Sequence, residues 1–287
     1  QRAFKTAKII CKNRIIKDIE TDDTYILSVC DKLISLLKII IDPDKNAYIC
    51  MSRDDATILG LFVKQFKYLQ DLVASYRSEN THLFFLVQRI RYETIIKMTY
   101  LIKYPSARRE YRLKSYKNRY KIYKEKTDDP VYKVMISKFL DDIVLDDFST
   151  GDFEQIKDWR LGSKSFDKIV ADVDYAENYK LAYGIPSDMI HSDWGEIRQL
   201  YLKQTEDGKV MFHDLGERKL HYRGLLYELD LSCNAAYSFI NWVEDSEEFR
   251  YNKFIKTNIR EIHEIVSIIL EHVLNIYRTS PDTYMSI

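Results

Sequence analysis

The sequence contains little glycine and little proline, with 8 and 5 residues respectively among 287. Average proteins contain roughly 7% glycine and 5% proline, and both residues interrupt regular helices. Long periodic segments rich in Leu, Ile, Lys and Glu fill the space between the few breaks. The scarcity of helix breakers therefore predicts an all-α protein, a bundle of about eight or nine helices.

Cysteine is also rare, and its spacing argues against two classes of small protein. The four cysteines show no CxxC pair and no zinc-finger spacing; they are Cys11, Cys30, Cys50 and Cys233. This pattern argues against a disulfide scaffold and against a structural zinc site. We expect no cofactor and no metal, and we expect a reducing, cytoplasmic location.

Neither sign of charge is in surplus, since Lys plus Arg and Asp plus Glu number 44 each. A nucleic acid would therefore have to be bound by a local patch. No apolar run approaches the roughly 18 to 20 residues of a membrane span, and Lys38 interrupts the nearest run, residues 33–41. We expect no membrane partner.

The basic first residues lack a long apolar region and a cleavage site, so we expect them to belong to the mature protein.

Apolar periodicity predicts three helices, over 24–41, 52–76 and 81–103. Ser52 and Asp55 resemble a capping box at the start of the second. Their short connections favour antiparallel neighbours in a bundle. Two further helices, predicted over about 223–243 and 246–277, would pack on this core. Asp207 and Gly208 form a turn signal that predicts at most one small β-hairpin near 200–222. No boundary is visible, so we expect one domain over 1–287.

A polar stripe marks a stretch in the second half of the chain. Four side chains recur every fourth residue, where a core helix would be apolar: Tyr179, Tyr183, Ser187 and His191. A helix predicted from about Ser165 leads into this stretch, and Gly184 and Pro186 interrupt it. His191, beside a hydroxyl and carboxylates, could act as a general acid or base. Alternatively, it caps helix carbonyls or closes a hydrogen-bond network.

A second polar pair lies on the apolar segment 81–103. Arg89 and Glu93 are four residues apart, and charged groups in such a setting need each other or further partners. Arg91 falls roughly 200° away, on another face. The pair could form a buried bridge that fixes helix register. Alternatively, it forms a site where this helix meets the polar stripe.

These residues resemble a known family. Arg-x-x-x-Glu at 89–93, followed by Tyr-x-x-x-Ser-x-x-x-His at 183–191, is similar to DUF5677, a family of uncharacterised, mostly bacterial helical proteins. The resemblance covers roughly residues 24–200. It implies a shared polar site rather than a particular reaction.

Such proteins are in turn similar to HEPN domains, helical bundles that include metal-independent ribonucleases of toxin and antiviral systems. Their signature, Arg followed after four to six residues by His, occurs once here, as Arg77 and His82. With 17 arginines and six histidines, about one such spacing arises by chance, so these two rank below the polar site. The resemblance also implies a homodimer.

The segment 107–126 is strongly basic, with nine Lys or Arg, two acids and four interleaved tyrosines. Such residues could track a phosphate backbone and stack bases. The RNA-binding candidates are Arg108, Arg109, Arg112, Lys114, Lys117 and Arg119. The alternative is a solvated helix whose tyrosines face the bundle.

Two functions are compatible with these patterns. In a HEPN-like ribonuclease or defence effector, His191 or His82 activates a ribose hydroxyl, and Arg89 or Arg77 stabilises the phosphorane. In the alternative, a non-catalytic binding or sensor protein, the same Arg, Glu, Tyr, Ser and His residues form a structural or ligand-binding network.

Overall fold

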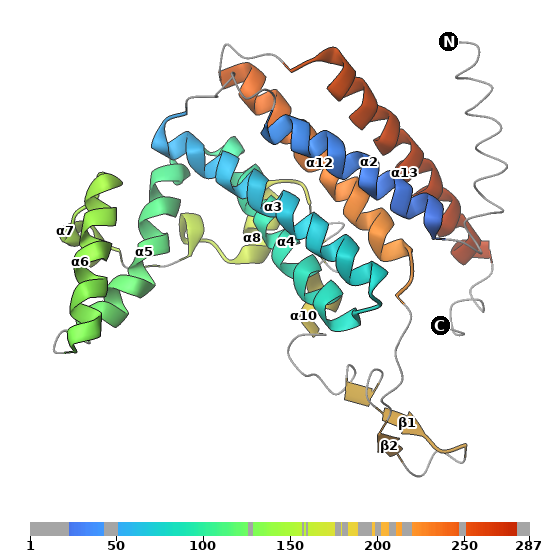
Figure 1. Cartoon of the computed structure of the whole chain (residues 1–287), viewed down its shortest axis with the longest axis horizontal. Helices are drawn as coiled ribbons and strands as arrows, with labels where there is room; N and C mark the ends of the chain where they lie inside the picture. Colours follow the sequence, from blue (N-terminus) through green and yellow to red (C-terminus); the bar gives the residue numbers. More distant parts are fainter. Residues whose placement is uncertain are drawn as a thin grey trace. The chain divides into compact units, whose positions relative to one another are not determined.

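Helices account for almost all regular structure in the part of the chain that the computed structural model describes (Figure 1). The described residues are 23–42, 51–125, 129–156, 158, 160–175, 179, 183–188, 197–198, 202–206, 211–213, 220–246 and 251–279. The all-α prediction is confirmed. None of the described helices is long and apolar enough to cross a bilayer.

The chain divides by its contacts into two compact units. One unit contains the described residues of 23–42, 63–93 and those after 180, and the other contains those of 51–62 and 94–179. Helices α3 (Arg53–Arg77) and α4 (Thr81–Lys103) each contribute residues to both. The expectation of a single domain over 1–287 stays a prediction.

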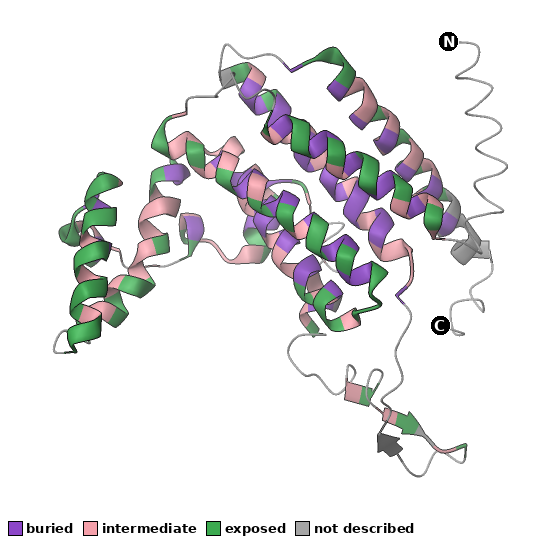
Figure 2. Ribbon diagram, in the orientation of Figure 1, coloured by how far each residue is buried: buried purple, intermediate pink, exposed green. Residues whose placement is uncertain are grey.

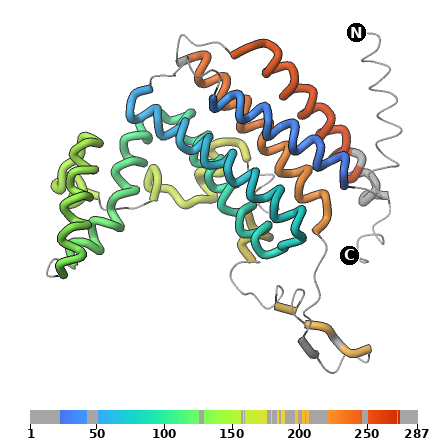
Figure 3. The backbone as a smooth tube through the Cα atoms, in the orientation of Figure 1, coloured from blue at the N-terminus to red at the C-terminus, as the bar shows by residue number. Residues whose placement is uncertain are grey.

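The first unit is built on three helices that lie side by side, α2 (Thr24–Ile41), α12 (Arg223–Ser246) and α13 (Lys253–Thr279), as the backbone trace in Figure 3 also shows. One stripe of α2 is fully buried, including Leu33 and Leu37. Tyr251, just before α13, donates a hydrogen bond to the Ile40 carbonyl at 3.2 Å. This joins the end of α2 to the start of α13.

Two paired strands lie where the hairpin was predicted, and the predicted turn at Asp207 and Gly208 falls outside the described residues. Strand β1 (Leu202–Gln204) pairs antiparallel with β2 (Met211–His213), and Lys203 lies opposite Phe212. A short helix, α10 (Ile185–Asp188), precedes it in the chain.

The second unit contains shorter elements, and the first three of them pack around an aromatic cluster. They are α5 (Ala107–Glu125), α6 (Pro130–Leu145), α7 (Thr150–Glu154), the 3-10 turn η1 (Leu161–Ser163) and α8 (Phe166–Asp172). Phe139 of α6 is buried, and Tyr116, Tyr120 and Tyr123 of α5 contact its ring. The expectation that the tyrosines of the basic segment face a core is confirmed for these three.

Two local expectations are wrong. The helix that begins near Ser165 does not continue to Tyr179, because α8 ends at Asp172 and Asp174 has a left-handed φ of 62°. The last two long helices divide later than expected, since α12 continues to Ser246 and α13 begins at Lys253. In both places the sequence offers no glycine or proline to mark the break.

A buried ion pair lies at the centre of the first unit. Arg91 of α4 contacts the Glu228 carboxylate of α12, and both side chains are almost fully excluded from solvent. The same guanidinium donates to Ser232 Oγ at 2.5 Å and to Gln65 Oε1 of α3 at 3.1 Å. Burial lowers the pKa of Arg91 and raises that of Glu228, so each charge depends on the other. One side chain thus fixes the register of three helices.

We expect Glu228→Leu to lower the free energy of unfolding by about 3–5 kcal/mol, because it leaves the Arg91 charge buried without its partner. The double variant Arg91→Met/Glu228→Leu should recover most of that loss, since it removes both charges. Urea denaturation of the two variants measures the difference. Equal stability of the single and double variants would show that the pair is not coupled.

His221 lies just before α12 and caps it. Its Nδ1 accepts a hydrogen bond from the Arg223 backbone N–H at 3.2 Å. Burial, followed by the neighbouring Arg223 charge, lowers the pKa of His221 to about 4. The ring is therefore neutral at neutral pH, as an acceptor must be.

Because the folded pKa lies below the unfolded value of 6.5, His221 stabilises the fold above pH 6.5, and this stabilisation is lost as the pH falls toward about 4. In His221→Asn the amide oxygen can accept the same bond without titrating. We expect the wild type to lose more unfolding free energy over this pH range than His221→Asn. Parallel pH curves would contradict the assignment.

Candidate functional site

Arg89 and Tyr183, 94 residues apart in sequence, are in contact. Arg89 Nη2 lies 3.3 Å from the Tyr183 hydroxyl oxygen, and the guanidinium carbon lies 5.1 Å from the centre of the Tyr183 ring. The ring of Tyr92, one turn along α4, lies 6.3 Å from that of Tyr183. Both members of the pair are half-buried. The structure therefore joins two of the predicted site residues through a cation–π contact and a hydrogen bond.

The guanidinium of Arg89 is incompletely paired within the described chain. Its Nε nitrogen is buried and has no hydrogen-bond acceptor there. No described carboxylate forms an ion pair with Arg89, and the predicted bridge to Glu93 is absent. A buried donor without an acceptor costs about 1–3 kcal/mol, and more for a charged group. Arg89 thus retains the capacity to bind an anion.

The remaining members of the predicted polar site are only partly accounted for. Glu93 is half-buried on α4, and Ser187 is half-buried on α10, directly after the buried Pro186. Among the described contacts, Ser187 forms no hydrogen bond to Arg89 or Tyr183. His191 lies outside the described residues, so its predicted role stays a prediction.

The alternative pair, Arg77 and His82, lies at the joint between α3 and α4. Arg77 Nη2 donates to both carboxylate oxygens of Asp31 of α2, at 2.8 and 2.7 Å. His82 is exposed and is the second residue of α4, directly after the joint. The structure therefore pairs Arg77 with an acidic residue, which lowers its capacity to stabilise the negative charge of a phosphorane.

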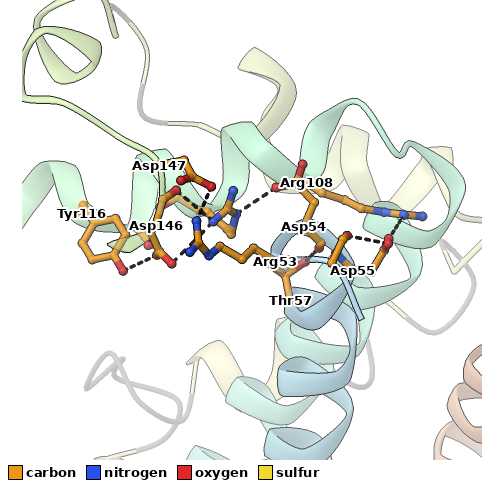
Figure 4. Close-up of polar contacts among 11 residues, drawn as sticks. Arg53, Asp54, Asp55, Thr57, Arg108, Tyr116, Asp146 and Asp147 are labelled. Carbon is orange, nitrogen blue, oxygen red and sulfur yellow. Dashed lines mark hydrogen bonds and ion pairs between the residues drawn. The ribbon is translucent and has the colours of Figure 1, made fainter. Parts of the chain in front are cut away.

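Two arginines in the first two turns of α5, Arg108 and Arg112, lie among acids, and Figure 4 shows the contacts around Arg108. Arg108 pairs with Asp55 of α3 and donates to the Leu101 carbonyl at 2.9 Å. Arg112 Nε lies 2.9 Å from Asp54 Oδ1, and Arg112 Nη1 lies 3.6 Å from Asp146 Oδ1. Arg53 and Tyr116 contact the same turn, through Asp147 and Asp146. These contacts hold the start of α3 and the turn after α6 against α5.

The other basic candidates of α5 are mostly engaged as well. Lys114 pairs with Glu110 and donates to the Arg160 carbonyl at 2.5 Å, and Lys117 donates to the Ile156 carbonyl at 2.9 Å. Arg109 lies over the Phe148 ring, 4.8 Å from its centre. Arg119 is exposed. The contacts favour the interpretation of 107–126 as a structural helix, because most of its cations already have partners.

The buried network around Arg91 was missed by the sequence analysis, which placed Arg89 and Glu93 in the core. A signal was present, since positions four and seven residues away from Arg91 along α4 form one buried stripe; they are Phe84, Val87, Ile95 and Met98. Arg89 lies outside that stripe. Glu228 and Ser232 occupy the corresponding buried face of α12.

The described residues form no candidate metal site, because no group of three or more His, Cys, Asp or Glu among them is placed to hold an ion. Cys30 and Cys233 are free thiols in the core, and burial raises the pKa of each to about 12. Neither thiol is therefore a reactive nucleophile.

Comparison with known proteins identifies one family. The model described as a family of unknown function, DUF5677, matches residues 55–210, which include Arg89, Tyr183, Ser187 and His191. This confirms the predicted resemblance. No curated protein and no solved structure matches significantly. The likeness to HEPN domains has no support from these comparisons.

The ion pairs of α5 lead to a stability prediction. Arg112→Gln should lower the free energy of unfolding by about 1–3 kcal/mol, because it removes the cation that pairs with both Asp54 and Asp146. The matched control Arg119→Gln removes an exposed charge and should stay within about 0.5 kcal/mol of wild type. Urea unfolding curves measure both. If the two variants lose the same stability, the network of Figure 4 does not hold α5 in place.

Proposed function

The chain belongs to the DUF5677 family, whose function is unknown, and from that premise we propose that it is a ligand-binding protein in which Arg89 binds an anionic group. One observation carries the proposal. The buried Nε–H of Arg89 has no acceptor, and its guanidinium has no carboxylate partner, within the described chain. Tyr183 holds that guanidinium by a cation–π contact and a hydrogen bond.

The chemistry of such a site favours phosphate or carboxylate. A guanidinium presents N–H donors in one plane, in a fork that matches two oxygens of either anion. Because Arg89 is half-buried, an anion there would be only partly screened by water. The cation–π contact and the hydrogen bond with Tyr183 restrain the guanidinium before binding, which reduces the entropy lost on association.

A metal-independent ribonuclease or defence effector is the second candidate. The same unpaired donor of Arg89 favours it, because a group that holds a phosphate can also stabilise the charge of a phosphorane. In this candidate His191 is the general base, with Glu93, Tyr183 and Ser187 around it. Recognition of RNA along α5 has less support, since Arg108 and Arg112 are bound by aspartates.

The cellular location is part of the same proposal. We place the protein in the reducing cytoplasm, and the free thiols of Cys30 and Cys233 support this location.

The proposal is tested by thermal unfolding in increasing inorganic phosphate at constant ionic strength. We expect the melting temperature of wild type to rise and then to level off, because an anion that binds only the folded state stabilises it. Arg89→Gln should lose this saturable rise. The matched control Arg77→Gln should keep it, since Arg77 is paired with Asp31 and exposed. An identical phosphate response of wild type and Arg89→Gln would overturn the proposal.

A second assay separates the two candidates. Wild type, His191→Ala, His82→Ala and Arg89→Ala are incubated with a mixed RNA pool in EDTA. A binding protein leaves the RNA intact. Cleavage by wild type that is lost in His191→Ala or His82→Ala, with the fold intact by circular dichroism, would establish the ribonuclease and identify its base.

A further inference from the structure

Helix α6 buries one face and exposes the other. Its buried face contributes Phe139 and Ile143 to the aromatic cluster. Figure 2 shows exposed residues along most of the helix, and several of them are large and apolar. Val134 is 72% exposed and Leu145 is 66% exposed. Single exposed apolar residues are normal, but a series on one helix marks a surface for interaction.

The exposed face has an ordered pattern. Positions 134, 138, 141 and 145 are separated by four, three and four residues, so they fall within about 60° of one another around the helix. Their side chains are Val134, Lys138, Asp141 and Leu145, all exposed. The series is apolar at both ends, with one cation and one anion between. We call these four residues the α6 face.

The two charges of the α6 face are not neutralised within the described chain. Lys138 and Asp141 form no ion pair or hydrogen bond with another described side chain. By contrast, most of the cations of α5 do. The charges of the α6 face are therefore available to a partner.

We propose that the α6 face binds a second copy of this chain, with the two α6 helices antiparallel. In that arrangement Val134 faces Leu145 of the partner subunit, and Lys138 faces Asp141 of the partner subunit. Each contact occurs twice, as a two-fold axis near positions 139 and 140 requires. The spacing is that of the a and d positions of an antiparallel helix pair.

Charge complementarity favours a second copy of the chain in the antiparallel arrangement. A parallel pairing in register would bring Lys138 against Lys138 of the partner subunit, and Asp141 against Asp141 of the partner subunit, which is repulsive. The antiparallel pairing replaces both repulsions by attractions and keeps the apolar residues together. Val131 and Met135, which are also exposed, border the face and extend its apolar area.

The association is expected to be weak. One pair of helices of this length buries less than the roughly 1,200 Å² of a standard stable interface. We therefore expect a monomer–dimer equilibrium with a dissociation constant in the micromolar range.

Sedimentation equilibrium of the full chain, up to several hundred micromolar, tests the proposal. Lys138→Glu and Asp141→Lys should each raise the dissociation constant about tenfold or more, because each places like charges opposite one another. The matched control is Lys133→Glu, which reverses an exposed charge of α6 roughly 110° away from the face. It should dimerise like wild type.

Two combinations make the test specific for antiparallel pairing. The double variant Lys138→Glu/Asp141→Lys restores opposite charges across the axis and should dimerise again. An equimolar mixture of the two single variants should form a heterodimer, since Glu and Lys then face each other at one contact and Asp and Lys at the other.

Circular dichroism of each variant serves as the control that it is folded. A wild type that stays monomeric throughout the concentration range would overturn the proposal. A dimer that neither single charge reversal weakens would also overturn it, because the contact would then lie elsewhere.

Discussion

The contact between Arg91 and Glu228 is the interaction on which the arrangement of the first unit depends. Two opposite charges are buried together, and either one alone would be strongly destabilising. The pair is stable only when α4 turns Arg91 inward and α12 turns Glu228 toward it. Gln65 of α3 and Ser232 of α12 occupy further donors of the same guanidinium.

The orientation of the candidate site follows from this register. Arg89 precedes Arg91 by two residues, which corresponds to roughly 200° around a helix. When Arg91 points into the core, Arg89 must point away from it, and there its guanidinium meets Tyr183. Arg91 is therefore paired with a buried carboxylate, whereas Arg89 keeps a buried N–H donor that has no acceptor in the described chain. The second unit shows a further solution, in which the acids of α3 and the turn after α6 neutralise Arg108 and Arg112.

Much of the fold could be predicted from the sequence, because strong apolar periodicity and scarce helix breakers specify long helices such as α2, α3 and α4. The proximity of Arg89 and Tyr183 could also be predicted, because the two family motifs that contain them indicate a shared polar site. The core position of Arg91 was not recognised, because the pair Arg89 and Glu93 was assigned to the buried face, whereas the stripe containing Val87 and Ile95 determines which face is buried. The partners of the basic segment could not be predicted, because Asp54 and Asp146 are distant in sequence and only the fold brings them to α5.

The most direct test of this account is the NMR signal of the Arg89 Nε–H group, assigned by its loss in Arg89→Lys. The account predicts a signal that exchanges slowly with water, because the nitrogen is buried, and that moves saturably when inorganic phosphate is added. A signal that exchanges as fast as that of an exposed arginine, or that phosphate leaves unmoved in the folded protein, would contradict it.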